Sequence, residues 1–243
     1  MNILCIGNSV SVDSNRYLYE IARKGGVNLR VATLYVGGCT LGMHFRNMRS
    51  EQPAYILYSN GMSTGFRVSM KEALLNRYWD VITSQQGSHE SFKPDTYFPY
   101  ATEIVDYVHQ MSPKAKIVVH QTWAYEQGSE KLARFGFSDQ KEMFNGLKDA
   151  YEQLCDSVQA VGIIPSGELF QKMLTSGFET VHRDTFHASL GAGRYALGLL
   201  WYRMLTGADV MDNGFCDFDE EVTPEQIRTI KELVQAYQPL QLK

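Results

Sequence analysis

The stretch that decides the fold is Asn2–Ser14, NILCIGNSVSVDS. Its apolar run Ile3–Ile6 stops at Gly7, which is typical of a strand buried on both faces of a parallel sheet. A helical pattern of apolar residues follows over 18–25. Ser9 lies between the two, at the carboxyl end of the strand, where open α/β sheets bind their ligands. From this stretch alone, Ser9 is also interpretable as a simple helix cap.

Strand-like and helical patterns alternate along the rest of the chain. Four further strands are predicted at Leu29–Val36, Trp79–Ser84, Lys116–His120 and Gly162–Pro165. Helices are predicted between them, and capping boxes at Ser69 and Thr223 mark two helix starts. Residues 54–68 are ambiguous and suggest a small hairpin, and 121–138 reads as a long loop. This alternation predicts a flavodoxin-like three-layer α/β/α fold around a five-stranded, mainly parallel sheet.

Length and composition narrow the possible partners. The 243 residues, 44% of them hydrophobic, are enough for one sizeable core, so we expect a single domain over 1–243. The net charge of −4 gives no electrostatic reason to expect nucleic acid or an anionic membrane as partner. The oligomeric state is left open.

Cysteine usage and the start of the chain bear on location. Four scattered cysteines without metal-site spacing suit reduced thiols in a reducing compartment. No apolar run approaches the ~18 residues of a membrane span, and the chain starts directly on its first strand. We therefore expect a cytoplasmic protein, although a removed signal peptide would leave the same sequence.

Polar loops follow the first three strands of the predicted parallel sheet. Ser9 follows the first strand, Gly38 the second and Gln86 the third, so parallel packing brings them to one edge. Asp184 and His187, three residues apart, precede a late helix that can fold back over that edge. Acyl transfer by a serine needs a base in hydrogen-bond reach, a group that orients the base, and donors for the oxyanion. Ser9 suits the role of nucleophile, His187 that of the base and Asp184 that of the group that orients the base. The oxyanion donors are expected to be the backbone N–H groups of Ser9 and Gly38 and the side-chain amide of Gln86.

These ordered motifs resemble the SGNH (GDSL-like) hydrolases over most of the chain. That family has Gly-Asp-Ser near the N-terminus, a Gly after strand two, an Asn after strand three and Asp-x-x-His near the C-terminus. This sequence has Gly7-Asn8-Ser9, Gly38-Cys39-Thr40, Gln86-Gly87-Ser88 and Asp184-Thr185-Phe186-His187 in the same order. The resemblance implies a serine esterase with a Ser9–His187–Asp184 triad, which requires no cofactor.

Two positions depart from the family pattern. Asn8 replaces the usual Asp, and Gln86 replaces the usual Asn. With Gln86 at this position, the loop resembles that of the sialate and other carbohydrate O-acetylesterases, which reads Gln-Gly-Glu. The match is nearest to a bacterial branch with a Gly-Asn-Ser start and a Gln-Gln-Gly-Ser loop. The resemblance therefore favours acetylated carbohydrate as the substrate, and either Gln85 or Gln86 as the third oxyanion donor.

Three further side chains are candidates for substrate contact. His44 and His89 are expected on loops at the sheet edge, and Trp123 offers a face for stacking on a sugar. For Trp123, a buried loop anchor is the simpler interpretation. A metal site built from His89, Glu90 and His120 has no motif behind it, so no metal is expected.

Other functions remain open at this stage. The same site suits an acyltransferase, a thioesterase or a lipase-like enzyme. A protein of a different class, a catalytically silent binding domain, would keep the fold and use Ser9 only to cap its helix.

Overall fold

A seven-stranded sheet forms the centre of the computed structural model, which describes residues 1–242. The strand order is β4-β3-β2-β1-β5-β6-β7. The strands are β1 (Asn2–Gly7), β2 (Arg30–Tyr35), β3 (Tyr55–Ser59), β4 (Met62–Val68), β5 (Val81–Ser84), β6 (Lys116–Gln121) and β7 (Ile163–Pro165). The five strands predicted from sequence are all present and run parallel to one another. The predicted α/β class is therefore confirmed.

The sheet is larger than predicted by two strands. The ambiguous segment 54–68 forms the hairpin β3–β4, which joins the sheet antiparallel beside β2. β3 buries Tyr55, whereas β4 at the sheet edge has no buried residue. Such a half-exposed hairpin has a weaker apolar pattern than the central strands, which explains why its membership of the sheet was not predicted.

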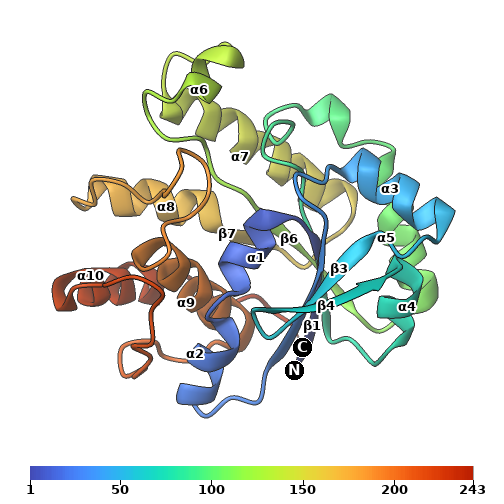
Figure 1. The fold of residues 1–243 in the computed structure, drawn as a ribbon, viewed down its shortest axis with the longest axis horizontal. Helices are drawn as coiled ribbons and strands as arrows, with labels where there is room; N and C mark the ends of the chain where they lie inside the picture. The colour runs from blue at the N-terminus through green and yellow to red at the C-terminus, as the bar shows by residue number, and fades with distance from the viewer. Residues whose placement is uncertain (243) are drawn as a thin grey trace.

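Helices cover both faces of the sheet, as Figure 1 shows. Alternate residues of β1 point to opposite faces, Ile3 and Cys5 to one and Leu4 and Ile6 to the other. The first face packs on α1 (Ser9–Asn15), α2 (Leu18–Lys24), α8 (Ser166–Thr175), α9 (Ala192–Thr206) and α10 (Pro224–Gln235). The second packs on α3 (Leu41–Ser50), α4 (Met70–Leu75), α5 (Tyr100–Met111), α6 (Glu130–Arg134) and α7 (Gln140–Ser157).

Two helical features differ from the sequence prediction. The helix predicted over 18–25 forms as α2, but an additional short helix, α1, precedes it, and α6 occupies part of the segment predicted as a loop. Both capping boxes, at Ser69 and Thr223, form as predicted. Among residues 1–242, none of the helices combines the length and apolarity that crossing a bilayer requires.

The topology places the nucleophile candidate at a switch point of the sheet. β1 lies in the middle, with β2 on one side and β5 on the other. The chain leaves β1 toward β2 on one side and leaves β5 toward β6 on the other, and ligands of open α/β sheets bind in the crevice beyond such strand ends. Ser9 is separated from the end of β1 only by Asn8 and is the first residue of α1.

Candidate active site

Ser9, His187 and Asp184 form a continuous chain of hydrogen bonds. The Oγ of Ser9 lies 2.9 Å from Nε2 of His187, and Nδ1 of His187 lies 2.7 Å from Oδ2 of Asp184. The other carboxylate oxygen of Asp184 accepts from the backbone N–H of His187 at 2.8 Å. The structure thus brings the three predicted residues together in the geometry that a nucleophile, a base and an orienting carboxylate require.

The Asp184 carboxylate is held in its charged form. Its partial burial works to raise its pKa, but hydrogen bonds from the ring and backbone of His187 outweigh that effect. The pKa of Asp184 is therefore below its ordinary value. A carboxylate that stays ionised at neutral pH fixes the His187 tautomer with Nδ1 protonated, which leaves Nε2 free to accept a proton from Ser9.

The loop that carries Asp184 and His187 is closed by a β-bridge between His182 and Ala188. Within it, Thr185 has a φ of 70°, a left-handed conformation that a β-branched residue rarely adopts. The Thr185 carbonyl accepts from the N–H of Glu126 at 2.7 Å, and the Phe186 carbonyl accepts from Nε1 of Trp123 at 2.7 Å. Trp123 is 2% exposed. The expectation that it stacks on substrate is corrected, because it is a buried anchor of the His187 loop.

Asp13, which no sequence motif marks, joins this loop to the helix that carries Ser9. It lies on α1 with a side chain 1% exposed, and its carboxylate pairs with Arg183 at 3.0 Å and Arg194 at 2.9 Å. It also accepts the backbone N–H of Ala188 at 3.2 Å. Ser9 and His187 therefore sit at opposite ends of one ion-paired joint. An acid on α1 and an arginine next to Asp184 are the only sequence features that could have indicated this ion pair. The sequence does not reveal that Asp13 is buried.

Two backbone N–H groups are available for an oxyanion. Within residues 1–242, the N–H groups of Ser9 and Gly38 form no hydrogen bond, and both residues line the cavity that contains Ser9 and His187. Gly38 has a φ of 61°, a backbone conformation suited to glycine. These are the two backbone donors that the sequence predicted.

Asn8 connects the two loops that supply these donors. Its Oδ1 accepts from the N–H of Val10 at 3.0 Å and caps α1, and its Nδ2 donates to the Cys39 carbonyl at 3.0 Å. The Cys39 carbonyl lies two peptide units beyond the Gly38 N–H, so this bond anchors the loop that carries the candidate oxyanion donor. The departure from the usual Asp therefore has a structural reason, because an amide donates where a carboxylate cannot.

The Gln86 amide does not reach the cavity, which corrects the expectation that it is an oxyanion donor. Its Nε2 donates to Thr96 at 3.1 Å, and its Oε1 accepts from the N–H groups of Leu41 and Gly87. Gln85 is also fully buried: its Nε2 donates to Asn8 at 2.7 Å, and its Oε1 accepts from Ser11 and His120. Both glutamines brace the loops around the site. Ser88 and His89, by contrast, line the cavity itself.

The cavity beside Ser9 measures about 480 Å³, within the usual range of ligand sites. Its walls include the aromatic rings of Tyr35, Tyr125, Phe135 and Phe186, and its cations are Lys131 and Arg134. Two larger hollows, of about 640 and 760 Å³, contain none of Ser9, His187 and Asp184, so we take the smaller one as the candidate active site.

Of the two histidines expected to contact substrate, one does not. His89 lines the cavity as expected. His44 is completely buried, stacked on Tyr55 with ring centroids 5.7 Å apart. Its place on the inner face of α3 against the hairpin β3–β4 corrects the expectation that it meets substrate. Lys131 and Arg134 were missed in the sequence, because the segment 121–138 was predicted as a loop without a helix.

Comparisons with known proteins agree with this architecture. Residues 2–232 match the model of a family described as a domain of unknown function, DUF4886. The sequence matches no curated protein. A crystal structure of a DUF4886 family protein from Bacteroides uniformis aligns with a TM-score of 0.89 and 29% identity, covering 97% of this chain and 93% of that one.

More distant solved structures share the fold. A protein assigned to the SGNH hydrolases, from Slackia heliotrinireducens, aligns at TM-score 0.60 and 22% identity, over 84% of this chain and 97% of that one. An acetylxylan esterase from Geobacillus stearothermophilus aligns at 0.52 and 14%, over 83% and 92%. The resemblance predicted from the ordered motifs is thus confirmed at the level of the fold. The chain belongs to the DUF4886 family and has the fold of the SGNH hydrolases.

Proposed function

We propose that this protein is a serine esterase that hydrolyses carboxylic esters, with O-acetyl groups on carbohydrate as its substrate class. The observation that carries the proposal is the hydrogen-bonded chain from Ser9 Oγ through His187 to Asp184, with distances of 2.9 and 2.7 Å. Asn8 caps α1, so Ser9 is not needed for that purpose, and a serine that only began a helix would not need a histidine and a carboxylate in line with its hydroxyl. The silent binding domain therefore fits the geometry less well than an enzyme.

The reaction proceeds in two balanced halves. Ser9 Oγ attacks the ester carbonyl carbon while its proton passes to Nε2 of His187, and the N–H groups of Ser9 and Gly38 receive the oxyanion. The tetrahedral intermediate collapses, the ester C–O bond breaks, and the His187 proton goes to the departing alcohol. Water then attacks the acyl-enzyme with the same base, and the carboxylic acid leaves as Ser9 regains its proton.

Two observations support carbohydrate esters in particular. The cavity is open to solvent and lined by several aromatic rings, which suit the apolar faces of a sugar. One neighbour with the same fold is named as an acetylxylan esterase. His89, at the cavity wall, is proposed to contact the substrate.

Initial rates on 4-nitrophenyl acetate, butyrate and octanoate, followed by acetate release from acetylated sugars, test the proposal. We expect the acetyl compounds to react fastest. Ser9→Ala should lower turnover by at least about 10³-fold, because members of a triad act as a unit. Ser50→Ala, an exposed serine on α3, is the control and should retain turnover. Full turnover by Ser9→Ala on every active ester would overturn the mechanism, and transfer of the acetyl group to an added alcohol in preference to water would identify an acyltransferase instead.

A further inference from the structure

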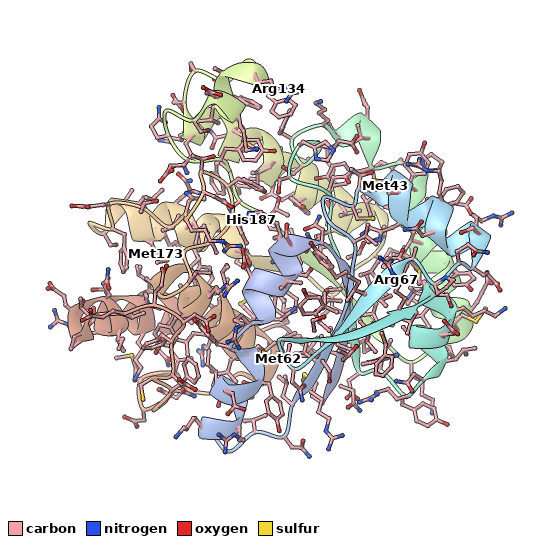
Figure 2. All side chains as sticks on the ribbon, in the orientation of Figure 1. Met43, Met62, Arg67, Arg134, Met173 and His187 are labelled. Atoms are coloured by element: carbon pink, nitrogen blue, oxygen red, sulfur yellow. The ribbon has the colours of Figure 1, made fainter. Side chains whose placement is uncertain are left out.

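The wall of the candidate active site that α6 provides carries positive charge. Lys131 and Arg134 lie on α6, one turn apart, and both line the cavity that contains Ser9 and His187. No aspartate or glutamate of residues 1–242 lines that cavity. In a chain with a net charge of −4, this is a local reversal of sign beside the candidate nucleophile. Figure 2 labels Arg134, on α6, and His187, on the loop before α9.

These two cations are not used for stabilising the fold through ion pairs. In the described part of the chain, nine ion pairs form, and neither Lys131 nor Arg134 takes part in any of them. The nearest acid by position is Glu130, which shares a neighbouring hollow of about 320 Å³ with both cations without pairing with either. Their charge is therefore available to a ligand.

Aromatic rings fix where this charge lies relative to the triad. The Nζ of Lys131 sits 4.4 Å from the centroid of the Phe186 ring, in the range of a cation–π contact. The Phe186 ring in turn lies 3.7 Å, centroid to centroid, from the ring of His187. Phe186 thus contacts both the Lys131 ammonium and the candidate base. A third cation, Lys93, is 5.2 Å from the ring of Phe135, which also lines the cavity.

We propose that the ester this site accepts carries an anionic group, a carboxylate, phosphate or sulfate, which Lys131 and Arg134 bind at the cavity wall. The proposal rests on the proposed function and specifies its substrate class further, as acylated acidic carbohydrate or another acidic ester. An anion bound there gains charge-assisted hydrogen bonds from the ammonium and the guanidinium, which a neutral ester of the same shape does not.

Matched pairs of esters separate the two sides on which the anion can sit. On the alcohol side, 4-acetoxybenzoate is compared with neutral 4-acetoxybenzamide. On the acyl side, 4-nitrophenyl hemiadipate is compared with 4-nitrophenyl hexanoate, after subtraction of the spontaneous rate. The quantity measured is the ratio of kcat/KM for the anionic ester to kcat/KM for the neutral ester. In a second set of substrates, the carboxylate is replaced by phosphate or sulfate.

We expect this ratio to favour the anionic ester in at least one pair. In Lys131→Gln/Arg134→Gln it should fall by about tenfold to a hundredfold, the size of one or two charge-assisted contacts. Lys24→Gln/Arg49→Gln removes the same charge from exposed positions outside the cavity and should retain the wild-type ratio. Added salt should reduce the wild-type preference. An equal fall in both double variants, or no preference in the wild type for either pair, overturns the proposal.

A binding measurement keeps this result separate from the question of catalysis. Calorimetric titration of Ser9→Ala with 4-acetoxybenzoate and 4-acetoxybenzamide needs no turnover. Tighter binding of the carboxylate that is lost with Lys131→Gln/Arg134→Gln supports the anion site even if no ester is hydrolysed. Hydrolysis that depends on Ser9 but shows no anionic preference in rate or binding overturns the anion site and leaves the esterase proposal standing.

Discussion

At the scale of single residues, Asn8 is the most informative departure from the family pattern. Its Nδ2 donates to the Cys39 carbonyl at 3.0 Å and so anchors the loop that carries the Gly38 N–H, two peptide units away. Asn8→Asp replaces this donor with a carboxylate oxygen facing a carbonyl oxygen. Because one oxyanion donor contributes about 10²–10³ in kcat, a displaced Gly38 N–H should cost roughly tenfold or more. The loss should fall on kcat more than on KM.

Comparison at two pH values distinguishes this positioning role from general damage. The carboxyl group introduced by Asn8→Asp can donate to the Cys39 carbonyl once it is protonated. The rate of this variant relative to the wild type should therefore rise as the pH is lowered toward the carboxyl pKa. An Asn8→Asp protein with wild-type kcat, or with a deficit that does not change with pH, would argue that the Cys39 bond does not position the donor.

At the scale of elements, the His187 loop is joined to α1 through Asp13. The Asp13 carboxylate is buried and pairs with Arg183 and Arg194, which lie on either side of His187 in the sequence. Breaking a buried pair on one side can cost up to about 3–5 kcal/mol, because the remaining charges lose their partner. Asp13→Asn should therefore lower both the melting temperature and kcat, since the joint also sets the distance between Ser9 and His187.

Asp219 offers a matched control on the same arginine. It pairs with Arg194 at 2.7 Å and Arg16 at 2.6 Å, outside the 182–188 loop. Asp219→Asn should lower stability while sparing kcat on 4-nitrophenyl acetate. If the two variants reduce kcat equally at equal loss of stability, Asp13 is a structural residue only, and the joint has no separate effect on the site.

At the scale of the whole molecule, buried histidines make the fold sensitive to acid. Burial lowers the pKa of both His44 and His120 to about 3, against about 6.5 in an unfolded chain. Both histidines are therefore neutral in the folded protein, and their contribution is fully present above pH ~6.5. As the pH falls below that value the unfolded chain binds more protons, so each histidine removes about 1.4 kcal/mol of stability per pH unit.

Urea unfolding at pH 7.5 and 5.5 measures this loss. Nε2 of His44 is buried without a hydrogen-bond partner in residues 1–242, but its Nδ1 lies 3.1 Å from the Tyr55 hydroxyl. His44→Phe therefore removes one titrating group together with one hydrogen bond, and the loss of that bond lowers stability equally at both pH values. The substitution should reduce the difference in unfolding free energy between the two pH values. His109→Gln, at an exposed position on α5, should leave that difference unchanged. A wild-type stability that is the same at both pH values would contradict the account.

The limits of prediction from sequence follow from the range of each interaction. Central strands such as Ile3–Ile6 were predictable because a strand buried on both faces consists of a continuous run of apolar residues. Ser9, Asp184 and His187 were predictable because strand order fixes the sheet edge and the Asp-x-x-His spacing is local. The orientation of the Gln86 side chain was not predictable, because it is set by hydrogen bonds to Thr96 and Leu41, ten and forty-five residues away in the chain. His44 and Trp123 were misplaced for the same reason, since their burial depends on the hairpin β3–β4 and the His187 loop.

Covalent labelling of Ser9 tests the central claim most directly, because it needs no knowledge of the substrate. The wild type is incubated with a fluorophosphonate probe at pH 7.5, and the modified peptide is located by mass spectrometry. We expect one adduct per chain, on Ser9, absent from Ser9→Ala and formed at least about 10²-fold more slowly by His187→Ala, which lacks the general base. A folded wild type that stays unlabelled, or that is labelled as fast without His187, would contradict the Ser9–His187–Asp184 mechanism.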